Sequence, residues 1–420
     1  MNILIIGGGG REHALLKSIA RNPQTKKLYA LPGNGGISSL AECVNISAAD
    51  IDSQVKFAVE NKIDFAIVAP DDPLALGAVD RLEEAGVKCF GPTQKAARIE
   101  SSKIFAKELM TKYGIPTAKY EIFTDIDKAL TYCATNTCPL VVKADGLAKG
   151  KGVTVCANFK QAREAVISCM KAKIFGEAGE RILIEECLTG PEVTVLALTD
   201  GHTITPLMSS MDHKRAYDGN TGPNTGGMGV IAPNPYYTPE IAEYCMKNIF
   251  LPTIDAMNKE GCAFKGCLYF GLMLTKDGPK VIEYNSRFGD PETEAILPLL
   301  DGDMLSLMLA VREERLAEAN VKFKAGASCC VVLASGGYPG ICLTGYPIDF
   351  GGAEVRAGVE VYHCGTKFTG TQYVTNGGRV LAVTGIGSTP EEARERAYDS
   401  VRLVKFEGMR YRTDIGAMPE

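Results

Sequence analysis

The segment Val141–Val153, VVKADGLAKGKGV, connects an apolar strand to a second β-branched strand through a loop of glycines and lysines. Glycine allows the backbone to approach a polyanion closely, and lysine supplies the opposite charge. The loop does not fit the P-loop frame G-x-x-x-x-G-K-[ST], and no helix follows it. The segment therefore predicts a β-hairpin whose tip closes over a nucleotide; the alternative is an ordinary flexible hairpin with solvated lysines. The residues concerned are Lys143, Gly146, Lys149, Gly150, Lys151 and Gly152.

Length and composition indicate an enzyme of several domains that acts on small molecules. The chain has 420 residues, enough for roughly three domains. Its net charge is −5, it has no Trp and its aromatic content is 7%, which argues against a nucleic-acid partner. No apolar run approaches the roughly 20 residues of a membrane helix, so we expect a cytoplasmic protein without membrane contact. The 14 cysteines form no C-x-x-C pair, which favours reduced thiols over disulfides or zinc.

The first hundred residues alternate strands and helices. Strands are expected at 2–6, before Leu31, at 65–68 and near 87–90, with a helix at about 74–85. This alternation predicts a parallel α/β domain over residues 1–100, with its ligand at the carboxyl ends of the strands. Those ends carry glycine- and proline-rich loops at 7–10, 32–36 and 69–73.

Three further units are expected after residue 100. Ser101 and Ser102 cap a helix over 103–110, and Gly114 with Pro116 ends it at a domain boundary. Residues 118–188 predict a small α/β unit with a helix at 159–171. Residues 101–117 and 189–324 predict a central domain with strands at 193–198, 203–207, 270–274 and 280–284 and a helix at 305–319. Residues 325–420 predict a small α+β domain ending in a helix at 390–404, so the fold class is multidomain α/β and α+β.

The glycine run at 7–10 does not fit a dinucleotide site. In the frame G-x-G-x-x-G the third glycine would fall at Glu12 or His13, and no acidic residue follows the second strand to bind a ribose. A glycine-rich helix N-terminus still suits a phosphate, and Arg11 lies beside it. We therefore expect a phosphorylated small molecule here, the alternative being a tight turn without a ligand.

Two later segments carry charge in patterns that suit an anionic ligand and a metal. Residues 212–229 form a charged, glycine-rich stretch, predicted to be a long functional loop. Strand alternation places Glu283 and Asn285 on one face, where their oxygens suit Mg²⁺, and Arg287 on the same face can brace a phosphoryl group. The alternative for the second segment is a polar strand face followed by a Gly-Asp-Pro turn.

A strand at 181–185 runs out into an irregular segment whose backbone can read an adenine edge. Glu185 and Glu186 at its end have an alternative interpretation as solvated strand-end residues.

Taken in order, these segments resemble the ATP-grasp ligases, and most closely the phosphoribosylamine–glycine ligase family. The motifs IGGGGREHAL, FGPT, KADGLAKGKGV, DHKR, TGPNTGGMG, RFGDPE and TNGGRVL span nearly the whole chain. The resemblance implies an N-terminal α/β domain, a central ATP-grasp domain with residues 118–188 as an inserted lid, and a C-terminal domain. It also implies ATP-dependent ligation of glycine to 5-phosphoribosylamine through glycyl phosphate, in purine biosynthesis, with Mg²⁺ or Mn²⁺, by a monomer.

The resemblance further implies a role for each motif residue. The nucleotide would contact Lys103, Lys143, Gly146, Lys149, Gly150, Lys151, Gly152, Glu185, Glu186, Leu188 and Glu192. Glu283 and Asn285 would bind the metal. Glycine and the transferring phosphoryl group would contact Asp212, Lys214, Arg287 and Asp290. Phosphoribosylamine would contact Gly9, Gly10, Arg11, Glu12, Pro32, Gly33, Asn34, Pro70, Asp71, Thr225, Gly226 and Gly227, with its phosphate at the helix N-terminus.

Two departures from the superfamily pattern affect this transfer. The strand before Glu283 reads Phe270-Gly271-Leu272-Met273 and lacks the second metal-binding acid of many ATP-grasp enzymes. The third N-terminal loop has Asp71 where the family commonly has Glu. Another ATP-grasp carboxylate–amine ligase or carboxylase, and a non-catalytic nucleotide sensor, are the alternative functions.

Overall fold

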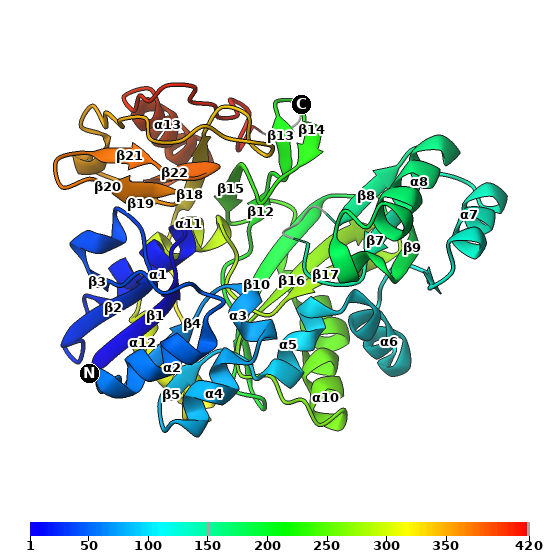
Figure 1. Ribbon diagram of the computed structural model, residues 1–420, viewed down its shortest axis with the longest axis horizontal. Coiled ribbons are helices and arrows are strands. Elements are labelled where there is room, and N and C mark those ends of the chain that lie inside the picture. Colours follow the sequence, from blue (N-terminus) through cyan, green and yellow to red (C-terminus); the bar gives the residue numbers. More distant parts are fainter. Residues whose placement is uncertain (149–151, 418–420) are drawn as a thin grey trace.

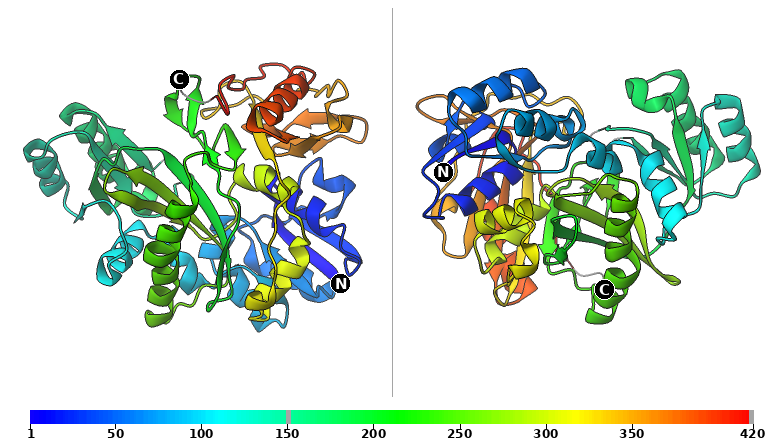
Figure 2. Two further views of the ribbon diagram at one scale, coloured as in Figure 1. Left: turned by 180° about the vertical axis from the view of Figure 1, so that it is seen from behind. Right: turned by 90° about the horizontal axis from the view of Figure 1, so that it is seen from below.

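The structure, a computed structural model, describes residues 1–148 and 152–417. The N-terminal sheet and the C-terminal sheet lie together on one side of the molecule, and the lid lies at the far side (Figure 1). The central sheet, which contains β10 (Glu192–Thr199), β16 (Gly266–Thr275) and β17 (Gly278–Asn285), connects them, and the views from behind and from below agree with this arrangement (Figure 2). The expected multidomain α/β and α+β class is confirmed.

The N-terminal unit is a five-stranded parallel sheet of order β3-β2-β1-β4-β5. Ile3 and Ile5 face one core, whereas Leu4 and Ile6 face another, as alternation along a strand requires. The strands are β1 (Asn2–Gly7), β2 (Lys27–Pro32), β3 (Glu42–Cys43), β4 (Phe65–Val68) and β5 (Lys88–Phe90). The helices are α1 (Gly10–Ile19), α2 (Ile51–Glu60), α3 (Asp71–Ala75), α4 (Ala78–Glu84) and α5 (Gln94–Ser101).

The single helix predicted over 74–85 is wrong. Two helices, α3 and α4, occupy this region, and Gly77 between them has φ +83°, a backbone conformation that ends one helix before the next begins. The helix expected from residue 103 is confirmed as α6 (Lys103–Tyr113), with Ser102 as its N-cap and Gly114 at its C-terminal end.

The lid contains a four-stranded antiparallel sheet of order β6-β9-β7-β8, covered by two helices. The predicted hairpin around the glycine-lysine loop is confirmed, because β7 and β8 pair antiparallel. The helix expected at 159–171 is α-helical only to Val166 and continues as a π-helical turn to Lys171. The elements are β6 (Tyr120–Phe123), α7 (Ile126–Thr135), β7 (Leu140–Ala144), β8 (Val153–Cys156), α8 (Phe159–Val166) and β9 (Ile182–Glu186).

The central sheet has the order β11-β10-β16-β17 and matches the four predicted strands. The long loop expected over 212–229 is instead about half strand: β13 and β14 form a hairpin, and β12 and β15 flank it. The elements are β10 (Glu192–Thr199), β11 (Ile204–Pro206), β12 (Met211–Asp212), β13 (Arg215–Tyr217), β14 (Thr221–Asn224), β15 (Gly229–Ala232), α9 (Pro239–Cys245), α10 (Leu251–Lys259), β16 (Gly266–Thr275), β17 (Gly278–Asn285) and α11 (Glu292–Ile296).

The C-terminal sheet shares two strands with the central segment, since its order is β12-β15-β18-β22-β19. The helix α13, expected to reach Val404, ends at Val401. The remaining elements are β18 (Ala327–Ala334), β19 (Val359–His363), β20 (Thr366–Phe368), β21 (Tyr373–Thr375), β22 (Arg379–Gly387) and α13 (Pro390–Val401).

The helix predicted at 305–319 is shorter, and it packs against the N-terminal unit. It is α12 (Met304–Arg312), which ends before Glu314, a residue with φ +57°, and contacts α1 and β5. Residues of α12 share one apolar core with the N-terminal sheet, the central sheet and β18. This common core holds one face of the N-terminal sheet against the central domain.

Candidate active site

The RFGDPE segment, residues 287–292, connects the N-terminal loop to the end of β17. Arg11 donates from Nη1 to the carbonyl oxygen of Phe288 at 3.0 Å and from Nε to Glu12 Oε1 at 2.7 Å. Both Arg11 and Glu12 are buried. The arginine predicted to assist a phosphate therefore directs its Nε atom and one Nη1 hydrogen to protein acceptors in this structure.

Carboxyl groups surround the first turn of α1. Gly9 N–H donates to Glu12 Oε2 at 2.5 Å, and Arg11 N–H points to Asp290 Oδ2 at 3.4 Å. A Cβ built on Gly10 would lie 2.2 Å from Glu294 Oε1. A substrate phosphate at this turn would have to displace the Glu12 and Asp290 oxygens from the Gly9 and Arg11 amides.

The second and third N-terminal loops lie beside the first. A Cβ on Gly8 would fall 2.3 Å from the carbonyl oxygen of Gly33, so the first two loops are in direct backbone contact. Asn34, after the end of β2 at Pro32, donates from Nδ2 to Gly8 O at 3.0 Å and to His363 O at 2.7 Å. The third loop places Pro70 and Asp71 at the start of α3. The negative charge of Asp71 is among the carboxylates that raise the pKa of Arg287, although burial acts to lower it.

Glu283 and Asn285 lie on β17 opposite Gly271 and Tyr269 of β16. A Cβ on Gly271 would approach Glu283 Cγ to 2.8 Å, so the glycine in the apolar strand makes room for the acid. Lys214 Nζ donates to Glu283 Oε1 at 2.7 Å and lies 3.7 Å from Glu192 Oε2. Burial acts to raise the pKa of Glu283, but Lys214, Lys143 and Lys103 lower it to about 2.

This pair fits a divalent cation that also binds phosphates. Glu283 is ionised at neutral pH and Asn285 offers an amide oxygen, which are the hard donors that Mg²⁺ and Mn²⁺ accept. Within residues 1–148 and 152–417, no group of three or more His, Cys, Asp or Glu side chains is arranged to hold a metal. The cation would therefore need other ligands besides these two, such as phosphate oxygens and water.

Arg287 lies beside this pair and is held by a residue that the sequence analysis missed. Its Nη2 atom lies 3.3 Å from Asn285 Oδ1 and 3.1 Å from Glu100 Oε1. Glu100 is buried and also accepts from Ser286 N–H at 2.7 Å and Ser286 Oγ at 2.9 Å. No local motif marks Glu100, because Ser286 is 186 residues away in sequence.

Asp212 and Glu292 form an acidic pair near the same centre. In the described part of the chain Asp212 Oδ1 is buried without a hydrogen-bond donor. Burial and the neighbouring Glu292 carboxyl raise the pKa of Asp212 well above its usual range. A Cβ on Gly227 would lie 2.8 Å from Asp212 Oδ1, so this loop closes over the acid. Glu292 belongs to the RFGDPE motif, but its residue type and spacing indicated no role for it in the sequence.

The lid side brings the predicted nucleotide residues together around Glu185. Lys143 Nζ contacts Glu185 Oε2 at 2.9 Å and donates to Ile282 O at 2.9 Å, and Lys107 Nζ lies 3.3 Å from the same carboxylate. Glu185 is buried, so its alternative interpretation as a solvated strand end is wrong. Glu186 is half-buried and accepts from Lys119 N–H at 2.9 Å, and Leu188 is half-buried beyond it.

The root of the lid loop is tied to the N-terminus of α6. Asp145 Oδ1 accepts from Ser102 Oγ at 3.0 Å and Ile104 N–H at 3.1 Å, and Asp145 Oδ2 pairs with Arg181 at 2.6 Å. Lys103 Nζ donates to Gly146 O at 2.8 Å. Gly152 lies near Ala148 at the other end of the loop. Lys149, Gly150 and Lys151 lie outside the described residues.

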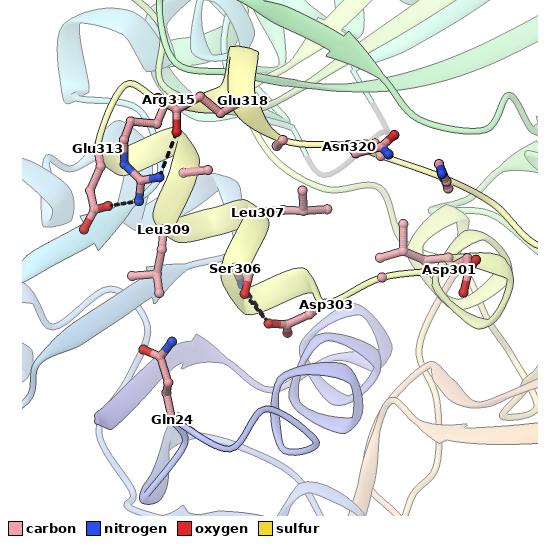
Figure 3. A pocket seen from close by; sticks show the side chains of 16 residues that line it. Gln24, Asp301, Asp303, Ser306, Leu307, Leu309, Glu313, Arg315, Glu318 and Asn320 are labelled. Carbon is pink, nitrogen blue, oxygen red and sulfur yellow. Dashed lines mark hydrogen bonds and ion pairs between the residues drawn. The ribbon is translucent and has the colours of Figure 1, made fainter.

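A cavity of about 540 Å³ lies elsewhere, between α12, the following turn and the loop at Gln24. Figure 3 shows its polar rim, where Arg315 contacts both Glu313 and Glu318. The lining contains none of the predicted site residues. We assign no function to this cavity.

Comparison with known proteins identifies the family. Three models match: the phosphoribosylglycinamide synthetase N domain at residues 1–100, its ATP-grasp (A) domain at 101–293 and its C domain at 328–418. The chain is 46% identical to a phosphoribosylamine–glycine ligase of Caldanaerobacter subterraneus, covering 99% of this chain and all of that protein. It is 42% identical to that of Clostridium acetobutylicum, covering 99% of each.

Solved structures agree. The crystal structure of phosphoribosylamine–glycine ligase from Thermotoga maritima superimposes with a TM-score of 0.84 at 33% identity, covering 99% of this chain and all of that one. A biotin carboxylase domain from Hydrogenobacter thermophilus, at 16% identity and TM-score 0.75 over 98% of this chain and 91% of that one, shares the fold alone. In the described residues no helix is long and apolar enough to cross a membrane. The chain belongs to the phosphoribosylamine–glycine ligase family of ATP-grasp enzymes.

Proposed function

We propose that this protein ligates glycine to 5-phosphoribosylamine at the expense of ATP, yielding glycinamide ribonucleotide, ADP and phosphate. One observation carries the proposal: the RFGDPE segment contacts the metal pair at one end and the N-terminal loop at the other. Arg287 lies 3.3 Å from Asn285 Oδ1, and the carbonyl of the next residue, Phe288, accepts from Arg11. In the proposal, the phosphoryl-transfer centre at Asn285 and Arg287 therefore lies next to the phosphoribosylamine site at the N-terminal loop.

The reaction has two steps. A carboxylate oxygen of glycine attacks the γ-phosphorus of ATP, the bond from that phosphorus to the bridging oxygen breaks, and ADP leaves. The amine nitrogen of phosphoribosylamine then attacks the carbonyl carbon of glycyl phosphate, the carbon–oxygen bond to phosphate breaks, and the nitrogen loses a proton. The glycine carboxylate is ionised at neutral pH, so the first step needs positioning and charge neutralisation rather than a strong base.

Each group of residues takes one part of this work in the proposal. Arg287, held by Glu100, neutralises charge on the transferring phosphoryl group. Lys214 and Asp212 hold glycine, with Asp290 closing the side toward α1. Glu283 and Asn285 would hold a Mg²⁺ or Mn²⁺ ion, which would neutralise charge on the ATP phosphates when bound. The nucleotide lies between Lys103, Lys143, Glu185–Leu188 and Glu192, and the lid loop excludes water from glycyl phosphate.

Phosphoribosylamine is proposed to occupy the three N-terminal loops, with Thr225–Gly227 at its other side. Because carboxyl groups surround the first turn of α1, we place the amine end rather than the phosphate nearest Asp290. The domain bounds 1–100, 101–117 with 189–324, 118–188 and 325–420 belong to the same proposal. We also propose that the protein acts in the cytoplasm as a monomer, without nucleic-acid or membrane partners. Sedimentation of the purified protein tests whether it is a monomer.

A coupled assay for ADP, with each substrate omitted in turn, tests the function. We expect ADP release to require glycine and to be stimulated by phosphoribosylamine, with glycinamide ribonucleotide as the product. Activity with bicarbonate in place of glycine would favour a carboxylase. Tight ATP binding without phosphate release under any combination would favour a nucleotide sensor.

A further inference from the structure

Arg379 is the first residue of β22 and belongs to the TNGGRVL motif, to which the function assigns no role. Its backbone is held firmly: Arg379 O accepts from Gly365 N–H at 2.8 Å, and a Cβ on Gly365 would lie 2.7 Å from that same oxygen. The preceding Gly378 accepts from Ser335 N–H at 2.8 Å. The guanidinium therefore projects from a fixed point of the C-terminal sheet.

The guanidinium binds two loops of the central domain. Arg379 Nη1 donates to Gly226 O at 2.9 Å and to Asp290 O at 2.8 Å, and Nη2 pairs with Asp290 Oδ1 at 2.9 Å. A second C-terminal residue assists, because Tyr338 Oη accepts from Gly226 N–H at 3.1 Å. Both backbone groups of Gly226 thus have partners in the C-terminal domain.

Each of these loops carries one half of the proposed reaction. Gly227, next to Gly226, lies against Asp212, which holds glycine in the proposed function. Asp290 directs its other oxygen, Oδ2, toward Arg11 N–H at 3.4 Å and toward Gly9 in the N-terminal loop. Arg379 therefore holds the junction between the glycine side and the amine side without touching the nucleotide residues around Glu185.

We propose that Arg379 is a positioning residue for amine transfer. It fixes the Gly289-Asp290-Pro291 turn and the Gly226–Gly227 loop relative to one another. Their relative position sets the distance between the acyl carbon of glycyl phosphate and the amine of phosphoribosylamine. Displacement of reacting groups by about 1 Å costs about 10²-fold in rate. This inference rests on the proposed function. It assigns Arg379 to amine transfer, a step that can be measured separately from the formation of glycyl phosphate.

The test separates formation of glycyl phosphate from its use. Hydroxylamine, a small nucleophile that needs no ribose site, replaces phosphoribosylamine and traps glycyl phosphate as glycyl hydroxamate. Arg379→Lys and Arg379→Gln are compared with wild type for hydroxamate formation, for glycinamide ribonucleotide formation and for the KM of ATP. We expect a loss of about 10²-fold in kcat/KM for phosphoribosylamine, with hydroxamate formation and the KM of ATP each within about threefold.

Arg394→Lys is the matched control. Arg394 is another half-buried arginine of the C-terminal domain that donates to two backbone carbonyls, those of Ile415 and Thr413, away from the site. It should lower the melting temperature without changing the ratio of amine transfer to hydroxamate formation. Tyr338→Phe removes one hydroxyl and should shift that ratio in the same direction as Arg379→Lys by a smaller factor, and it serves as the reporter if the Arg379 variants do not fold.

A parallel loss of both products in the Arg379 and Tyr338 variants, or no loss of either, would overturn the positioning role. Failure of the proposed function has a different signature, because wild-type protein would then form neither hydroxamate nor ADP with glycine.

Discussion

Two glycine-rich loops, one before α1 and one in the lid, look alike in composition and behave differently in the structure. In the α1 loop the glycines meet protein: a Cβ on Gly8 would strike Gly33 O at 2.3 Å, and one on Gly10 would strike Glu294 Oε1 at 2.2 Å. The described part of the lid loop is attached at its root, through Asp145 and Gly146 O. Glycine in the first loop permits close packing of three domains, whereas the described lid glycines meet only the lid itself: a Cβ on Gly146 would lie 2.6 Å from Ala178 Cβ, and one on Gly152 would lie 2.8 Å from Ala148 Cβ.

The largest effect is expected from Glu283→Ala, on the central strand β17, which the lid residue Lys143 contacts through Ile282 O. Loss of a carboxylate metal ligand should reduce ADP formation by about 10³-fold or more, since phosphoryl transfer depends on charge neutralisation. The melting temperature should also fall at neutral pH, because the folded protein lowers the pKa of Glu283 to about 2 through Lys214 and two other lysines, and the variant loses this charge pairing. Retained turnover with saturating Mg²⁺ would contradict the metal assignment.

Gly10→Ala probes the packed loop. Its Cβ would meet both Glu294 Oε1 and Cys364 Sγ, at 2.2 and 2.7 Å, so we expect destabilisation of about 1–3 kcal/mol in urea unfolding. Gly302→Ala is the control, since Gly302 has no positive φ and no atom within 4 Å of its Cβ position. Equal stability of the two variants would show that the α1 loop is not tightly packed.

Glu294→Gln should make the protein more stable than wild type, by a margin that grows as pH rises. Burial, with the adjacent Asp290 charge, raises the pKa of Glu294 well above its usual value, although Arg379 and Arg11 act to lower it. The unfolded chain loses this proton near pH 4.3, whereas the folded chain keeps it to higher pH. The free energy of unfolding of the wild type therefore falls by about 1.4 kcal/mol for each pH unit between the two pKa values. Denaturant unfolding at pH 4.5 and 7.5 should show the variant's advantage growing with pH; a constant difference would contradict this.

A smaller effect is expected at acid pH from His13, which links α1 to the C-terminal domain. His13 Nδ1 accepts from His363 N–H at 2.8 Å, and burial, with His363 and Lys17, lowers the pKa of His13 well below its usual value. The unfolded chain binds a proton as pH falls below about 6.5 while the folded chain does not, so stability falls.

His13→Asn keeps an acceptor and removes the titration. Thermal melts at pH 7.5 and 5.5 should therefore show a smaller acid-induced loss for the variant than for wild type. An unchanged loss would place the acid sensitivity elsewhere, for example at His213, whose pKa burial lowers to about 4.

The strands predicted from the sequence match the structure where a buried apolar run alone determines the strand. Apolar runs bounded by glycine or proline gave β1, β4, β10 and β17 close to their observed bounds, because burial on a sheet selects the same residues in any context. Prediction failed at 212–229, where polar residues form strands only by pairing with one another and with the C-terminal sheet. The residue Gly77 was likewise not recognised as a break between two helices.

The candidate site shows the same division. Residue type and spacing indicated Glu283, Asn285, Arg287 and the lid hairpin, because a metal, a phosphate and a flexible loop each require particular side chains. Glu100, Asp145 and Arg379 were assigned no role, although the last two lie in quoted motifs, since partners of each are supplied by other domains.

The chain's motifs alone specified an ATP-dependent ligase and the side chains that its chemistry needs. Only the folded protein determined that the α1 turn is surrounded by carboxyl groups, that Glu185 is buried between two lysines, and that one arginine of the C-terminal sheet holds two central loops. The physical reason is that burial, pairing and pKa depend on distances between residues far apart in sequence, which no local pattern encodes.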